Sequence, residues 1–191
     1  MFLVKYNIFI LLLLVLIVMG EDCPKIKTRK KWGGLPTLSV EYQIIPVKFV
    51  IIHHTVTSTC TSYSQCAEIV QNIQDYHMKK LGWSDIGYNF LIGNDGNIYE
   101  GVGWHKIGAH TYGYNSKSIG IAFIGNFDNA LPTTAALDAA KKLLECGVEK
   151  GELSRRYKLF GGRQVSSTVS PGLELYNEIQ DWDHWSEPEK N

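Results

Sequence analysis

Residues 48–53 read KFVIIH, a short apolar run rich in β-branched residues. A run of this length and composition is typical of a strand buried in the interior of a sheet. Residues 118–124 read SIGIAFI and have the same character. We therefore expect two interior strands, with the rest of the chain arranged around them.

The residues between these two strands predict one helix and one hairpin. Residues 62–65 (SYSQ) offer a capping box for a helix that ends at Gly82. One face of this helix carries Cys66, Val70, Ile73 and His77. Residues 88–92 and 98–102 flank the turn sequence NDGN at 94–97, which is a strong signal for a β-hairpin.

The C-terminal part predicts two more helices and one more strand. A helix follows residues 131–134 (LPTT), and residues 157–161 and 173–182 read as a short strand and a last helix. The first of these helices has one apolar face, formed by Leu137, Ala140, Leu144 and Val148. Strands that alternate with helices in this way predict an α/β fold, with a central sheet flanked by helices. We expect a mixed sheet, because a hairpin lies among helical crossovers.

The first twenty residues are typical of a secretory signal peptide. Lys5 precedes an apolar run that extends from Ile8 to Met19, and the small residue Gly20 stands at the junction. The run is shorter than the roughly 20 residues that a membrane-spanning helix needs, so a membrane anchor is disfavoured. We expect cleavage after Gly20, secretion to the extracellular space, and one domain over residues 21–191 with no membrane span.

The charges of the chain are balanced but unevenly placed. There are 19 basic and 19 acidic residues, whereas a general nucleic-acid binder carries a basic excess. We therefore expect no nucleic-acid partner. Residues 25–31 are basic and residues 174–189 are acidic, and both runs are interpreted as solvated surfaces.

Four cysteines in an oxidising compartment favour two disulfides over a zinc site, since none stands in a close Cys-x-x-Cys pair. Three pairings are formally open. Cys60 and Cys66 are close enough in sequence to form a small clip. Cys23 and Cys146 then remain, and they would connect the N-terminal segment to a late helix.

The adjacent histidines His53 and His54 are a tempting metal motif, but neighbours on a strand point to opposite faces. The pair therefore supplies one ligand at most, whereas a catalytic zinc needs about three protein ligands. From the residues alone, a histidine at the end of a strand is more often hydrogen-bonded in a groove or core than bound to a metal.

Four stretches resemble successive signatures of a known family, the peptidoglycan-recognition proteins, which are animal relatives of phage and bacterial zinc amidases. The stretches are IIHHTVTSTC (51–60), WSDIGYNFLIGNDGNIYEGVGW (83–104), GAHTYGYNSKSIGIAFIGNF (108–127) and GGRQVSSTVSPG (161–172). The resemblance extends from Trp32 to Trp185. Residues 143–154 and 170–185 are similar to the short secreted insect members that signal upstream of the Toll pathway.

This resemblance implies a zinc-amidase-like mixed sheet with an L-shaped groove for the glycan and its stem peptide. In members that cleave N-acetylmuramoyl-L-alanine amides, the zinc ligands map to His53, Gly162 and Ser170 of this chain. Glycine offers no ligand, and a serine hydroxyl is a poor zinc ligand compared with a thiolate. We therefore expect no metal, no cofactor and no amidase activity. His53, Tyr88, Thr168 and Ser170 would remain as vestiges of the catalytic site.

The groove that the resemblance implies is expected to bind the muramyl stem peptide of peptidoglycan. Its candidate contacts are His54, Thr55, His77, Gly82, Trp83, Tyr88, Val102, His110 and Asn115. The Gly82-Trp83 pair is similar to the pair in diaminopimelate binders. Those binders usually have an arginine where this chain has Val102, however, so the preference between lysine-type and diaminopimelate-type ligands stays open.

Three functions follow from these residues. The first is non-catalytic recognition of peptidoglycan that passes a signal to an extracellular partner upstream of a protease cascade. The second is residual hydrolysis, either as a weak amidase or as a metal-independent peptidase with Ser170 as nucleophile and His53 as base. The third, direct antibacterial action, would be expected of a more cationic chain.

Overall fold

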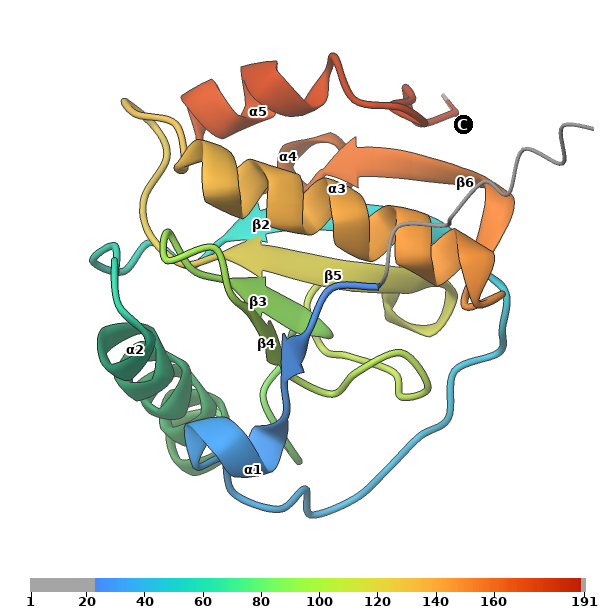
Figure 1. Cartoon of the computed structure of the whole chain (residues 1–191). Coiled ribbons are helices and arrows are strands. Elements are labelled where there is room, and N and C mark those ends of the chain that lie inside the picture. Colours follow the sequence, from blue (N-terminus) through green and yellow to red (C-terminus); the bar gives the residue numbers. More distant parts are fainter. Residues whose placement is uncertain (1–22, 190–191) are drawn as a thin grey trace, which may run out of the picture.

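A six-stranded mixed sheet runs through the molecule (Figure 1), in the order β1-β4-β3-β5-β2-β6. The computed structural model describes residues 23–189. The predicted signal peptide lies outside the described residues and stays a prediction. The strands are β1 (Ile26–Lys27), β2 (Val47–His54), β3 (Phe90–Ile92), β4 (Ile98–Glu100), β5 (Ser118–Phe123) and β6 (Leu153–Gly161).

The helices pack on both faces of this sheet (Figure 1). They are α1 (Arg29–Trp32), α2 (Tyr63–Asp75), α3 (Thr134–Glu149), α4 (Gly162–Val165) and α5 (Leu173–Ile179). A π-helical turn, η1 (Tyr76–Lys80), continues α2, and a short 3-10 turn, η2 (Asn115–Lys117), precedes β5. Between residues 23 and 189, no helix combines the length and the apolar character that a membrane crossing requires.

The two runs that open the sequence form neighbouring parallel strands. In the β2–β5 pair, Phe49 is in register with Ser118 and His53 with Ala122. Every residue of β5 is buried, as expected for a strand in a parallel region covered on both faces. The β3–β4 hairpin is antiparallel, whereas β3–β5, β2–β6 and β1–β4 are parallel. The predicted α/β architecture with a mixed central sheet is confirmed.

Two apolar clusters lie on opposite faces of the sheet. One contains Val50 and Ile52 of β2 and packs under α3 and α5. The other contains Val70 of α2 and Trp32 of α1. Because side chains alternate along a strand, His53 is directed to the α1–α2 face.

Several predicted boundaries were wrong by a few residues. Strand β6 begins at Leu153 and not at residue 157, because buried Leu153 pairs with Val47 of β2 before an irregularity in the register. Helix α5 ends at Ile179 and not at residue 182. The hairpin strands β3 and β4 have three residues each. Strand β1 and helices α1 and α4 were not predicted, since elements of two to four residues leave no periodic pattern in a sequence.

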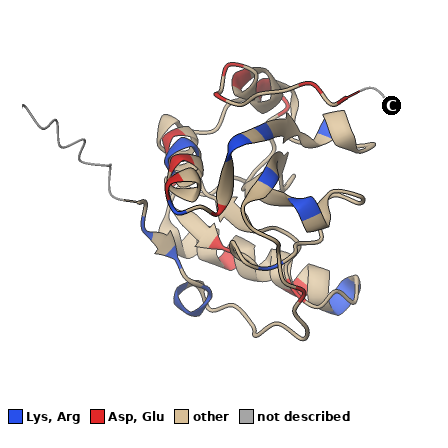
Figure 2. Ribbon diagram, turned by 90° about the vertical axis from the view of Figure 1, so that its right-hand side faces the viewer, with Lys and Arg blue, Asp and Glu red and all other residues tan. Residues whose placement is uncertain are grey.

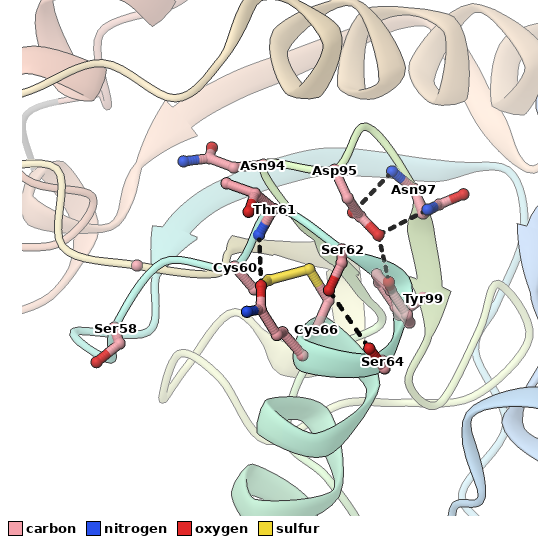
Figure 3. The surroundings of a disulfide bond; sticks show 12 residues. Ser58, Cys60, Thr61, Ser62, Ser64, Cys66, Asn94, Asp95, Asn97 and Tyr99 are labelled. Carbon is pink, nitrogen blue, oxygen red and sulfur yellow. Dashed lines mark hydrogen bonds between the residues drawn. A yellow bond between two sulfur atoms is a disulfide. The ribbon is translucent and has the colours of Figure 1, made fainter.

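The predicted capping box at residues 62–65 does not form. Ser62 is the N-cap of α2 but makes no capping bond to the helix. Its hydroxyl pairs with Ser64 at 3.4 Å, and the Gln65 side chain accepts from the Thr61 N–H at 3.3 Å (Figure 3).

Both expected disulfides are present. Cys23–Cys146 ties the N-terminal segment to α3, and Cys60–Cys66 closes the loop between β2 and α2. The second disulfide packs against the hairpin turn, where the Asp95 carboxylate accepts from Asn97 and from the Tyr99 hydroxyl (Figure 3). Gly93 permits this contact, because a Cβ there would lie 2.5 Å from the Cys66 sulfur.

Candidate functional site

A buried histidine at the end of β2 is the centre of the predicted site. His53 is 5% exposed, and both of its ring nitrogens face hydroxyl groups. Nε2 lies 3.1 Å from Thr111 Oγ1, and Nδ1 lies 3.3 Å from Ser170 Oγ. One nitrogen donates and the other accepts, so the neutral imidazole is fully hydrogen-bonded.

Gly162 and Ser170, the two other positions where the resemblance leads us to expect amidase zinc ligands, also lie against His53. A Cβ atom built on Gly162 would be 2.9 Å from His53 Nδ1. A side chain at position 162 and the Ser170 hydroxyl would thus meet at the same imidazole nitrogen. Among residues 23–189, no group of three histidine, cysteine, aspartate or glutamate side chains could hold a metal ion. The residues present therefore do not fit a catalytic zinc.

His110 lies beside this cluster, with its ring 5.4 Å from that of His53. Its Nδ1 is 3.1 Å from Thr111 Oγ1, while its buried Nε2 has no hydrogen-bond partner in the described part of the chain. Gly120 on β5 leaves space for the ring, since a Cβ there would lie 2.4 Å from His110 Cγ.

The cluster is electrically neutral near pH 7. Burial lowers the pKa of His110 to about 4. Burial, reinforced by the neighbouring histidines His110 and His54, holds the pKa of His53 well below its usual value. Both imidazoles are therefore weakly basic, which makes them poor groups for proton abstraction near pH 7.

Two hollows lie next to each other on this side of the molecule. The first, of about 500 Å³, is lined by residues that include Thr55, His77 and Tyr88, and we call it the Tyr88 hollow. The second, of about 540 Å³, is lined by residues that include Trp83 and Val102, and we call it the Trp83 hollow. The rings of His77, in the first hollow, and Trp83, in the second, are 4.7 Å apart. The two hollows therefore lie on either side of this pair, and we refer to them together as the groove.

Two side chains that line the Tyr88 hollow, those of His77 and Thr55, are oriented by hydrogen bonds to the backbone. His77 Nδ1 accepts from the Gly87 N–H, and burial lowers the pKa of His77, so it presents a neutral ring. Tyr88 lies 5.8 Å from the His53 ring, and burial raises its pKa to about 12. Thr55 Oγ1 accepts from the Gly125 N–H and pairs with Thr57. These side chains offer hydroxyl and imidazole groups on an aromatic wall.

The remaining predicted contacts differ in position. Gly82, with φ +71°, and Asn115 line the Trp83 hollow. The Asn115 amide oxygen accepts from the N–H groups of His110 and Thr111, so it orients the turn that carries them. Thr168 is exposed, and its hydroxyl accepts from the Ser170 N–H.

His54 does not lie with the other predicted contacts, and this part of the prediction needs correction. Its Nδ1 accepts from the Phe127 N–H on the α3–α5 face of the sheet. The strand alternation that carries His53 to the groove carries His54 to the opposite core. His54 is therefore a packed core histidine.

Three residues of the site were missed by the sequence reasoning. Thr111 joins His53 to His110 through its hydroxyl. Fully buried Asn89 donates to the carbonyls of Gly103 and Lys106 and thereby holds the loop below the groove. Asp85, in the wall of the Trp83 hollow, forms a bidentate ion pair with Arg29. An asparagine between two aromatic residues of the predicted strand 88–92 is a sequence signal that could have indicated Asn89. Arg29 and Asp85 offered no such signal.

Comparison with known proteins agrees with this geometry. A family model described as N-acetylmuramoyl-L-alanine amidase matches residues 43–173. Peptidoglycan-recognition protein SA of Drosophila melanogaster is 57% identical over 183 residues, which cover 92% of this chain and 90% of the relative. A solved structure of Drosophila peptidoglycan recognition protein SA matches with a TM-score of 0.86 and 60% identity, over 87% of this chain and 97% of that one.

A related protein has been solved with a ligand. The complex of tracheal cytotoxin with the ectodomains of recognition proteins LCa and LCx matches with a TM-score of 0.83 and 46% identity, over 84% of this chain and 98% of that one. The amidase-like sheet, the groove beside His53 and the extent of these matches lead to one assignment: this chain belongs to the peptidoglycan-recognition proteins of the amidase domain family.

Proposed function

We propose that this chain is a secreted recognition protein that binds peptidoglycan in the groove and signals its presence without cleaving it. The observation that carries the proposal is the environment of His53. Its two ring nitrogens are engaged by Thr111 and Ser170, and Gly162 supplies no ligand. The groove beside it nevertheless keeps aromatic and hydrogen-bonding walls.

The chemistry of the groove suits a muramyl stem peptide. The rings of Trp83, His77 and Tyr88 offer flat faces to sugar rings and methyl groups, and neutral imidazole and hydroxyl groups can bond amide and sugar oxygens. Solved complexes of related recognition proteins with tracheal cytotoxin, a monomeric diaminopimelic acid-type peptidoglycan, support a peptidoglycan fragment as the ligand class. Val102 is 7% exposed and apolar, so it cannot pair with the extra carboxylate of a diaminopimelate residue.

The test measures binding and cleavage on the same sample. Purified oxidised protein is incubated with insoluble lysine-type and diaminopimelate-type peptidoglycan, bound protein is quantified, and released stem peptide is analysed by mass spectrometry, with the zinc content determined in parallel. We expect binding, less than one zinc per chain and no released peptide. Absence of binding to both polymers, or stem-peptide release that a chelator abolishes, would overturn the proposal.

A matched pair of variants links binding to the groove. Tyr88→Phe removes a hydroxyl from the groove wall and should weaken binding two- to tenfold, in proportion to one hydrogen bond. Tyr63→Phe makes the same change on the exposed N-terminal turn of α2, outside both hollows. It should leave binding unchanged. Equal losses in both variants would place the ligand elsewhere.

A signal must then pass to a second extracellular protein that activates a protease cascade. This step is proposed from the resemblance to insect members that act upstream of Toll. Purified chain and peptidoglycan together, but neither alone, should trigger serine-protease activity in cell-free insect haemolymph depleted of its own recognition proteins.

Residual hydrolysis is the second candidate, because Ser170 Oγ lies 3.3 Å from His53 Nδ1. In that reaction the Ser170 oxygen would attack the peptide carbonyl, its proton would pass through His53 to the leaving amine, and water would hydrolyse the ester. The depressed pKa of His53 makes it a poor base, and Thr111 stands where a carboxylate would orient it. Turnover that survives a chelator but is lost in Ser170→Ala would establish this activity.

A further inference from the structure

A cleft lies on the other side of the sheet, between the C-terminal half of α3 and the segment that follows α5. Its volume is about 480 Å³, and we call it the α3 cleft. Its lining includes Glu145, Glu149, Asp181, Asp183, Tyr157 and Trp182. In Figure 2, acidic residues mark α3 and the chain around α5. The peptidoglycan groove lies on the α1–α2 face, so the two sites can be occupied at the same time.

The charge of the α3 cleft is unbalanced. Four carboxylates line it against one ammonium group, that of Lys141. Lys141 is already committed, because its Nζ lies 3.4 Å from the Glu178 carboxylate and 5.1 Å from the centre of the Trp182 ring. Within residues 23–189, the four lining carboxylates make no ion pair. They are therefore available to a cation from outside.

Tyr157 is the second, independent feature of the cleft. It is 5% exposed, yet its hydroxyl makes no hydrogen bond with any part of the chain that the structure describes. Its ring stacks on His184, with centroids 4.1 Å apart. Burial raises the pKa of Tyr157, and the carboxylates of Asp183 and Glu145, which line the same cleft, raise it further. An almost buried, unpartnered hydroxyl beside two carboxylates is a prepared hydrogen-bonding position.

We propose that the α3 cleft docks a lysine or arginine side chain from a basic segment of a partner protein. The cation would lie among the four carboxylates, and its aliphatic stem would pack against half-buried Val148, which also lines the cleft. The Tyr157 hydroxyl would serve as a further hydrogen-bonding group. Charge complementarity selects the partner: the cleft disfavours acidic segments by like-charge repulsion. The proposal does not depend on what the groove binds.

The test uses a fluorescein-labelled tetra-arginine amide as the probe and a tetra-glutamate amide as its counterpart, with fluorescence anisotropy as the measurement. The double variant Glu145→Gln/Asp183→Asn neutralises the cleft. The control Glu68→Gln/Asp138→Asn removes the same charge from exposed positions on α2 and α3 outside the cleft. We expect tetra-arginine binding that weakens with salt, at least tenfold loss in the cleft variant, and less than twofold loss in the control.

A third variant, Tyr157→Phe, tests the hydroxyl separately from the charges and should weaken probe binding two- to tenfold. The proposal is overturned by absence of tetra-arginine binding at low salt, or by equal weakening in the two double variants, which would indicate a long-range charge effect. It is also overturned if sedimentation shows that the chain self-associates and the cleft variant does not, since the occupant is then a second copy. All variants should retain peptidoglycan binding; its loss in the cleft variant alone would refute the independence of the two sites.

Discussion

Substitution of Asp85 by asparagine tests how much the Arg29–Asp85 ion pair stabilises the contact between the N-terminal segment and the Trp83 hollow. Asp85 accepts hydrogen bonds from Arg29 Nη1 and Nη2 at 2.7 Å each, from Gln74 Nε2 at 2.9 Å and from the Ile86 N–H at 2.7 Å. The Asp85 side chain is 7% exposed and that of Arg29 is 17% exposed. The pair therefore joins a residue of α1 to the wall of the Trp83 hollow in a largely water-free position.

The magnitude follows from this burial. Removal of one partner from a buried ion pair costs about 3–5 kcal/mol, since the other charge stays desolvated. Arg29 keeps its hydrogen bonds to the carbonyls of Leu35 and Gly101. We therefore expect Asp85→Asn to lower the free energy of unfolding by about 3 kcal/mol, the lower end of this range. For a domain of this size, that corresponds to a fall in Tm of about 6–12 °C.

The assay is urea and thermal unfolding of the disulfide-intact protein, followed by circular dichroism. Asp75→Asn is the matched control, because it removes an exposed i,i+4 pair with Lys79 and should cost less than about 0.5 kcal/mol. The Arg29→Met variant completes a double-mutant cycle with Asp85→Asn. If Asp85→Asn costs no more than Asp75→Asn, or if the cycle gives no coupling, the pair does not fasten the segment and our reasoning is wrong.

Two further predictions concern stability. Replacement of both cysteines of a disulfide by serine should lower the free energy of unfolding by about 5 kcal/mol for Cys23–Cys146 and by about 2 kcal/mol for Cys60–Cys66. The difference arises because the first disulfide closes a loop of 123 residues and the second a loop of 6. Equal decreases in the two variants, measured by urea unfolding, would contradict this prediction. Burial holds the pKa of His110 near 4, against an unfolded value of 6.5. The unfolded state therefore takes up the proton first as the pH falls. Neutral His110 therefore contributes its full stabilisation above pH 6.5, and the free energy of unfolding falls by about 1.4 kcal/mol per pH unit between pH 6.5 and pH 4. The His110→Gln variant should show a flatter dependence of unfolding free energy on pH in this range.

The central architecture was predictable because it rests on local patterns. Residues 49–52 and 119–124 carry no charged or hydrogen-bonding side chain, and a continuous apolar run of this kind is typical of strands covered on both faces. The hairpin turn at 94–97 and the apolar stripe of α3 are equally local. Strand β1 escaped prediction because its two residues acquire strand geometry only through pairing with β4.

The site was predictable as a set of residue types but not as a set of contacts. The alternation along β2 indicated that His53 and His54 would separate, and they do. Which hydroxyls would meet His53 depends on three segments brought together by the sheet: Ser170 comes from a position 117 residues away and Thr111 from one 58 residues away. No periodicity encodes such pairings.

The hydroxyl partners of His53 also explain how a buried imidazole is stabilised at the end of β2. An imidazole left buried without partners would cost about 1–3 kcal/mol. Here Thr111 and Ser170 satisfy both nitrogens, and the Ser170 hydroxyl also accepts from the His54 N–H at 3.0 Å, so it ties the loop before α5 to the end of β2. Ser170 thus supplies a structural connection that a metal bridge could otherwise make. Both nitrogens of the neutral His53 ring are therefore already hydrogen-bonded within the protein, which disfavours a role for His53 as a general base.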